Sequence, residues 1–85
     1  VLVTIDAARG INNGQPSLWA RAFDRLGLRP GARVLHVAAG TGYYSAILAE
    51  TVGPTGRVVA VEYEADLAER ARINLEPWPQ VTVVH

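Results

Sequence analysis

Apolar residues in this sequence follow two different spacings. Helical spacing runs over residues 16–27, where Pro16 suits the first position of a helix and Gly27 a left-handed end. Short apolar runs at 33–38, 58–61 and 81–84 predict buried strands, and helical stretches at about 43–51 and 65–75 separate them. The apolar positions of the first helix are Leu18, Trp19, Ala22, Phe23 and Leu26, and we expect Trp19 and Phe23 to pack in the core.

This order of elements predicts an α/β fold. Apolar strands that alternate with helices are typical of a doubly wound (Rossmann-like) parallel sheet with helices on both faces. A sheet of three strands would leave a long apolar edge unpaired. We therefore expect residues 1–85 to form the N-terminal part of a larger domain, with a lead-in (1–15), a leading helix (16–27) and a strand-helix-strand-helix-strand half (33–85).

Composition narrows the function classes. The chain has 85 residues, enough for one small domain, and its 49% apolar and 19% charged residues are typical of a globular protein. Eight basic and eight acidic residues cancel, so nothing indicates bulk electrostatic binding of nucleic acid or of a membrane surface. The lack of cysteine excludes a disulfide framework, a thiolate metal site and a cysteine nucleophile, and two distant histidines do not form a metal site. The default compartment is the cytoplasm.

A glycine turn and an acidic residue predict a binding site. Gly40 and Gly42 follow the first strand, so a ligand can approach the backbone closely and meet the free N–H groups of the next helix. Glu62 comes twenty residues after Gly42 and closes the neighbouring strand, where an acidic group typically accepts hydrogen bonds from ribose hydroxyls. Together these residues predict a nucleoside-containing ligand at the carboxyl ends of the first two strands.

The kind of nucleoside can be narrowed from the same residues. A dinucleotide site needs a third Gly or Ala where this chain has Ser45, and a helix precedes the first strand, so both features disfavour NAD. The chain has no lysine, which excludes a P-loop.

The stretch 34–50 resembles the first motif of class I S-adenosylmethionine-dependent methyltransferases. More narrowly, Gly42-Tyr43-Tyr44, the turn at 52–59, Glu62 and the upstream Gly14-Gln15-Pro16-Ser17 look like the protein-L-isoaspartate O-methyltransferase family, over residues 11–85. The resemblance implies that Gly40, Thr41 and Gly42 line the methionine part of S-adenosylmethionine, with Tyr43 beside them. It also implies that Glu62 holds the ribose, that Tyr63 lies near the adenine, and that Gln15 and Pro16 shape the substrate edge.

Three residues depart from the family pattern. The family usually has an acidic residue where this chain has His36. A neutral imidazole would hold the cationic amino end of the cofactor by a neutral hydrogen bond, which weakens cofactor binding by roughly five- to tenfold. It usually has a glycine at the position of Ala38 and a hydroxyl at that of Gly14. The last difference bears on isoaspartyl specificity more than on the cofactor.

The resulting hypothesis is methyl transfer from S-adenosylmethionine to a protein or peptide carboxylate, such as an isoaspartyl side chain. Displacement at a sulfonium carbon depends mainly on alignment and needs no acid-base or nucleophile constellation. The sequence contains no such constellation and therefore identifies no catalytic residue. A binding protein that has kept the fold but lost catalysis is the alternative, and an NAD-dependent oxidoreductase is a weaker one. The sequence leaves the oligomeric state open.

Overall fold

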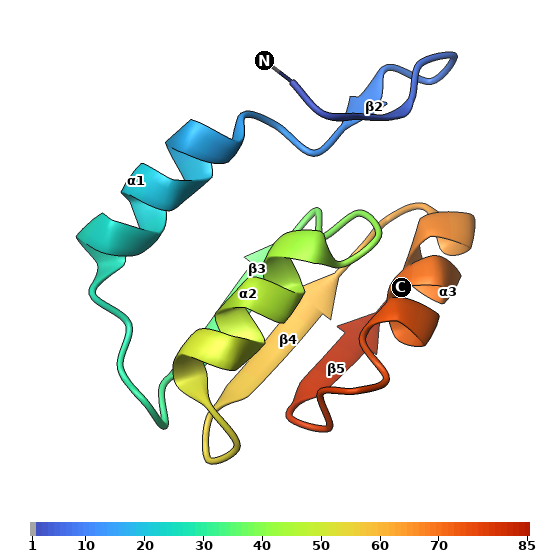
Figure 1. Cartoon of the computed structure of the whole chain (residues 1–85). Helices are drawn as coiled ribbons and strands as arrows, with labels where there is room; N and C mark the ends of the chain where they lie inside the picture. The colour runs from blue at the N-terminus through green and yellow to red at the C-terminus, as the bar shows by residue number, and fades with distance from the viewer. Residues whose placement is uncertain (1) are drawn as a thin grey trace.

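The computed structural model describes residues 2–85 as a three-stranded sheet with helices and a small N-terminal hairpin (Figure 1). The predicted strands and helices agree with the observed ones to within one residue at each end. In chain order the elements are β1 (Thr4–Asp6), β2 (Ile11–Asn12), α1 (Pro16–Leu26), β3 (Arg33–Val37), α2 (Tyr43–Val52), β4 (Arg57–Val61), α3 (Ala65–Asn74) and β5 (Val81–Val84).

The sheet is parallel, with the strand order β3-β4-β5. Val34 pairs with Val58, which pairs with Val81, so these three side chains share one face. Leu48, Ala49 and Val52 of α2 pack with Val58 in a core cluster on that face, where Phe23, Leu28, Ala32, Val34, Trp78 and Val81 join it. The α/β class with a Rossmann-like parallel sheet, predicted from the sequence, is confirmed.

The opposite face of the sheet is open within residues 2–85. Leu35 and Val37 point to it and are each 65% exposed. Figure 1 shows α2 and α3 on the same side of the sheet. The described helices therefore cover one face, and not both as the sequence predicts for the whole fold.

Residues 2–15 form more than the lead-in expected for 1–15, of which Val1 lies outside the described residues. β1 and β2 pair antiparallel through Thr4 with Asn12 and Asp6 with Ile11, with an irregularity between the two pairs. Strands of three and two residues are too short to show alternation, which is why the sequence pattern did not predict them. The hairpin lies beyond the ends of the strands where α2 begins (Figure 1).

Helix α1 contacts the rest of the fold through its aromatic residues. The ring of Trp19 stacks on that of Tyr44 with their centroids 4.4 Å apart, and Phe23 packs against the core cluster. Leu18 and Leu26 are more than 60% exposed, so the face of α1 that packs against the fold is narrower than the apolar pattern predicts. None of the helices in the part of the chain that the structure describes is long and apolar enough to cross a membrane.

Candidate cofactor site at the carboxyl ends of the strands

The chain between β3 and α2 turns sharply through left-handed backbone. Ala38 has φ 61°, Gly40 has φ 61° and Gly42 has φ 93°. A Cβ atom on Gly42 would lie 2.7 Å from Cδ1 of Leu75, so that side chain would have to move, and the φ of 93° independently favours glycine. Ala38 adopts the same kind of conformation with a side chain, which is strained for an L-residue.

Glu62 joins this turn to the end of β4. Its Oε1 atom accepts a hydrogen bond from the backbone N–H of Gly40 at 2.7 Å, and its Oε2 atom accepts one from the N–H of Glu64 at 2.8 Å. The residue is only 6% exposed. A carboxylate has about four lone-pair positions, so two remain for a ligand after these bonds.

Three pockets adjoin the turn and share lining residues. Glu62, Gly40 and Ala38 line one of about 310 Å³ with Tyr63 at its wall. Ala38 and Asn12 are shared with a second pocket of about 210 Å³, which His36 also lines. Volumes of this size are at or below the lower end of the range for small-molecule sites. The pockets are neighbours around the turn, and together they form the candidate binding region.

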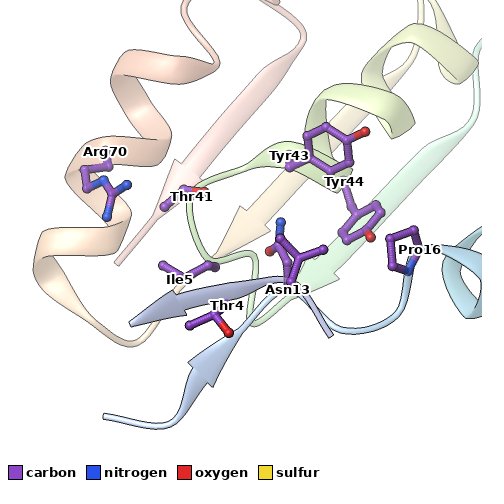
Figure 2. A pocket seen from close by; sticks show the side chains of 9 residues that line it. Thr4, Ile5, Asn13, Pro16, Thr41, Tyr43, Tyr44 and Arg70 are labelled. Carbon is purple, nitrogen blue, oxygen red and sulfur yellow. The ribbon is translucent and has the colours of Figure 1, made fainter. Parts of the chain in front are cut away.

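A third pocket of about 490 Å³ lies on the other side of the turn and is drawn in Figure 2. Tyr44 and Asn13 line both this pocket and the one at His36. Thr41, Tyr43 and Pro16 supply further parts of its wall, and Arg70 of α3 lies across from Tyr43 and Pro16 (Figure 2). Among the described residues, no carboxylate forms an ion pair with Arg70.

His36 lies beneath the turn on the covered face of the sheet. Its Nδ1 atom is 2.7 Å from Oγ of Ser45, and the edge of its ring meets Trp19 at a centroid distance of 5.4 Å. Burial lowers the pKa of the imidazole, so the ring is neutral at pH 7. His36 therefore offers the adjoining pocket a neutral group and no charge.

The structure brings most of the predicted site residues to this region. His36, Ala38, Gly40, Thr41, Tyr43, Glu62, Tyr63 and Pro16 each line at least one of the three pockets. Gly42 lines a fourth recess with Asn74 and Trp78, and this recess shares Thr41 and Tyr43 with the pocket of about 490 Å³. Gln15 lines none of these pockets, and its carbonyl accepts hydrogen bonds from the first turn of α1.

Two groups of lining residues were not predicted from the sequence. Ile5, Asn12 and Asn13 reach the pockets because the hairpin folds over the turn, and Arg70 reaches one from the second turn of α3. No local pattern identifies either group, since each depends on contacts between distant parts of the chain. Within residues 2–85 no three His, Cys, Asp or Glu side chains are grouped as metal ligands would be.

Comparison with known proteins matches this geometry to one class. The chain resembles a solved protein-L-isoaspartate O-methyltransferase with a TM-score of 0.86 and 36% identity, over 99% of this chain and 27% of that one. It resembles a SAM-dependent O-methyltransferase from Thermotoga maritima with a TM-score of 0.72 and 30% identity, over 81% of this chain and 27% of that one. The fold is thus that of the Rossmann-like, S-adenosylmethionine-dependent methyltransferases.

Sequence comparison narrows the class to a family. The family model described as Protein-L-isoaspartate(D-aspartate) O-methyltransferase (PCMT) matches residues 3–84. A protein-L-isoaspartate O-methyltransferase from Aeropyrum pernix is 51% identical over 70 residues, which are 78% of this chain and 27% of that protein. The chain belongs to the protein-L-isoaspartate O-methyltransferase family, and it spans between 24% and 40% of the length of the curated relatives it matches.

Proposed function

We propose that the protein transfers the methyl group of S-adenosylmethionine to a carboxylate of a protein or peptide, of the isoaspartyl type. The observation that carries this proposal is the position of the Glu62 carboxylate, 2.7 Å from the N–H of Gly40 at the wall of a pocket. The family supports the reaction, since its model matches residues 3–84 of this chain.

The residues present fit the cofactor. A Cβ atom on Gly40 would lie 3.3 Å from Cδ1 of Ile5 and 3.5 Å from Oδ1 of Asn13, so glycine keeps the space between turn and hairpin free. In the proposal, Glu62 accepts hydrogen bonds from the ribose hydroxyls and Tyr63 lies against the adenine. Gly40, Thr41, Gly42 and Tyr43 hold the methionine part, near His36 and Ala38.

The third pocket fits the methyl acceptor. Its wall is mostly apolar, and Arg70 supplies a cation that is not paired within the described residues. An arginine at the edge of such a pocket attracts a carboxylate and orients it by a charge-assisted hydrogen bond. We assign Pro16 to the same edge, with Gln15 beside it on the chain.

The chemistry asks little more of the chain. The cofactor supplies a methyl carbon that its sulfonium has already activated, so a carboxylate can accept the methyl without a general base. What the protein must do is align the acceptor with the methyl group and exclude water. The apolar wall formed by Tyr43, Tyr44 and Ile5 serves the second task.

A second candidate function is cofactor binding without catalysis. The neutral, buried His36 favours it, since the family usually has an acidic residue there. Both candidates share the cofactor, and they differ in whether an acceptor is methylated. The cytoplasmic location stays a prediction from composition.

The test uses the full-length gene product with methyl-labelled S-adenosylmethionine. We expect label to transfer to a peptide that contains isoaspartate and not to the same peptide with normal aspartate. Calorimetry with S-adenosylhomocysteine measures cofactor binding separately. Binding without transfer would favour the second candidate, and no binding at millimolar ligand would exclude both.

A further inference from the structure

The guanidinium of Arg9, in the loop of the hairpin, is surrounded by three carboxylates. Its Nε atom pairs with Oδ2 of Asp6 at 2.8 Å within the hairpin. Its Nη1 and Nη2 atoms donate to the two carboxylate oxygens of Asp66 at 3.2 Å and 2.8 Å, and Nη1 also lies 3.5 Å from Oε2 of Glu64. Two parallel bonds to one carboxylate fix the direction of the arginine as well as its distance.

These contacts join the hairpin to the rest of the fold. Within the described chain, every hydrogen bond between residues 2–14 and residues 15–85 comes from the Arg9 side chain. The connection continues inward, because the N–H of Glu64 donates to Glu62, whose other oxygen receives the N–H of Gly40. A path of polar contacts of 3.5, 2.8 and 2.7 Å thus runs from Arg9 through Glu64 and Glu62 to the glycine turn.

The hairpin is also a wall of all three pockets. Gly10, Ile11 and Asn12 face Glu62 across the pocket of about 310 Å³. Asn12 and Asn13 line the pocket at His36, and residues 3–5 with Asn13 line the pocket at Tyr43 and Arg70. If the hairpin moves away, the three pockets lose one side.

We propose that Arg9 is a positioning residue that holds the β1–β2 hairpin over the glycine turn, and that the hairpin thereby closes the binding region around the cofactor. The part of this inference that concerns the cofactor rests on the proposed function. The part that concerns the hairpin does not.

Electrostatics gives the proposal a measurable signature. Arg9 is a partly exposed cation, so salt screens its pairs over a Debye length of about 10 Å at 0.1 M. Removing its charge leaves the carboxylates of Asp6, Glu64 and Asp66 without the cation that they share. The apparent affinity for the ligand is proportional to the fraction of molecules in which the hairpin is in place. If the hairpin is in place in about a tenth of the molecules, the affinity is therefore about tenfold weaker.

The experiment compares Arg9→Gln with the wild-type full-length gene product. The matched control is Arg72→Gln, which removes an equally charged arginine that pairs with Glu69 on the surface of α3. Hydrogen exchange reports the N–H groups of Val3 and Asn13, which bond within the hairpin segment. Calorimetry at low and high salt measures the affinity of the protein for S-adenosylhomocysteine.

We expect Arg9→Gln to speed exchange in the hairpin and to weaken S-adenosylhomocysteine binding by about tenfold. Salt should weaken binding to the wild type and have little effect on the variant. Arg9→Lys should recover part of the affinity, and the exchange of charges in Arg9→Asp with Asp66→Arg should recover more than either single change. Arg72→Gln should behave as the wild type.

Equal exchange and equal affinity in Arg9→Gln and the wild type would overturn the proposal. Faster exchange with unchanged affinity would overturn its binding part. A wild type that does not bind S-adenosylhomocysteine would instead count against the proposed function, and the exchange measurement would still decide whether Arg9 positions the hairpin.

Discussion

The Oε1 atom of Glu62 accepts the N–H of Gly40 at 2.7 Å, which joins two residues that lie 22 positions apart in the sequence. This bond brings Glu62, which the sequence predicts to bind the ribose, next to the predicted glycine turn. The carboxylate holds the end of β4 against the end of β3, and it also faces the pocket between them. Its hydrogen bonds give it a structural role, and its proposed role in binding can be measured separately.

Replacing Glu62 by glutamine tests both roles. The amide has one acceptor atom, so one of the two backbone N–H groups loses its partner, and we expect a loss of about 1–3 kcal/mol in the free energy of unfolding. Loss of the charge should also weaken S-adenosylhomocysteine binding by about tenfold or more, because hydrogen bonds to charged groups are the stronger ones. Denaturant unfolding and calorimetry measure the two effects. Glu69→Gln on the surface of α3 is the control, and equal affinity in the two variants would contradict the role of Glu62 in binding.

Replacing Arg70 by glutamine tests the acceptor pocket. We expect the KM for an isoaspartyl peptide to rise about tenfold, since a charge-assisted hydrogen bond to the acceptor is lost. The KM for S-adenosylmethionine should change little, because Arg70 lines the pocket away from Glu62. Steady-state kinetics separate the two constants. Arg72→Gln makes the same change in charge two residues away, and a similar rise in that variant would mean that net charge, and not the pocket, is responsible.

Replacing Ala38 by glycine tests the strained turn. Ala38 has φ 61°, a conformation that costs an L-residue about 1–2 kcal/mol and glycine almost nothing. Greater freedom of glycine in the unfolded chain offsets part of the gain, so we expect a net stabilisation of about 0.5–1 kcal/mol. Ala39→Gly changes the neighbouring residue, which is buried and has no positive φ, and should destabilise the protein. Urea denaturation of the two variants should give shifts of opposite sign.

Stability should fall as the pH drops below 7, because His36 is buried. Desolvation lowers its pKa in the folded protein below the ordinary value of 6.5, so the unfolded chain binds a proton that the folded one does not. The contribution is therefore fully present above pH 6.5 and is lost as the pH falls toward the lowered pKa. His36→Asn keeps a polar atom within reach of Ser45 and cannot titrate. Between pH 5 and 7, the free energy of unfolding should depend less steeply on pH in this variant than in the wild type. Equal slopes would contradict the assignment of this pH dependence to His36.

Much of the sheet could be predicted from local patterns. The runs at 33–38, 58–61 and 81–84 are apolar because both faces of a parallel strand are shielded in a complete fold, and all three form strands here. The glycine turn and the acidic strand end could also be predicted, since each is required by backbone conformation or by the end of a strand. The hairpin could not, because two strands of three and two residues carry no period.

The sequence by itself determined which segments become strands and helices and where the chain must bend, since these depend on neighbours a few positions apart. The tertiary structure alone decided that Arg9 meets Asp66 across 57 positions and that Arg70 faces a pocket. It also decided that Ala38, and not only glycine, takes a left-handed conformation. The spacing of apolar residues predicts which face of a helix or strand is buried. A contact between distant side chains, by contrast, forms only after packing has placed both elements. The binding region belongs mostly to the second kind, because the walls of its pockets come from separate elements of the fold.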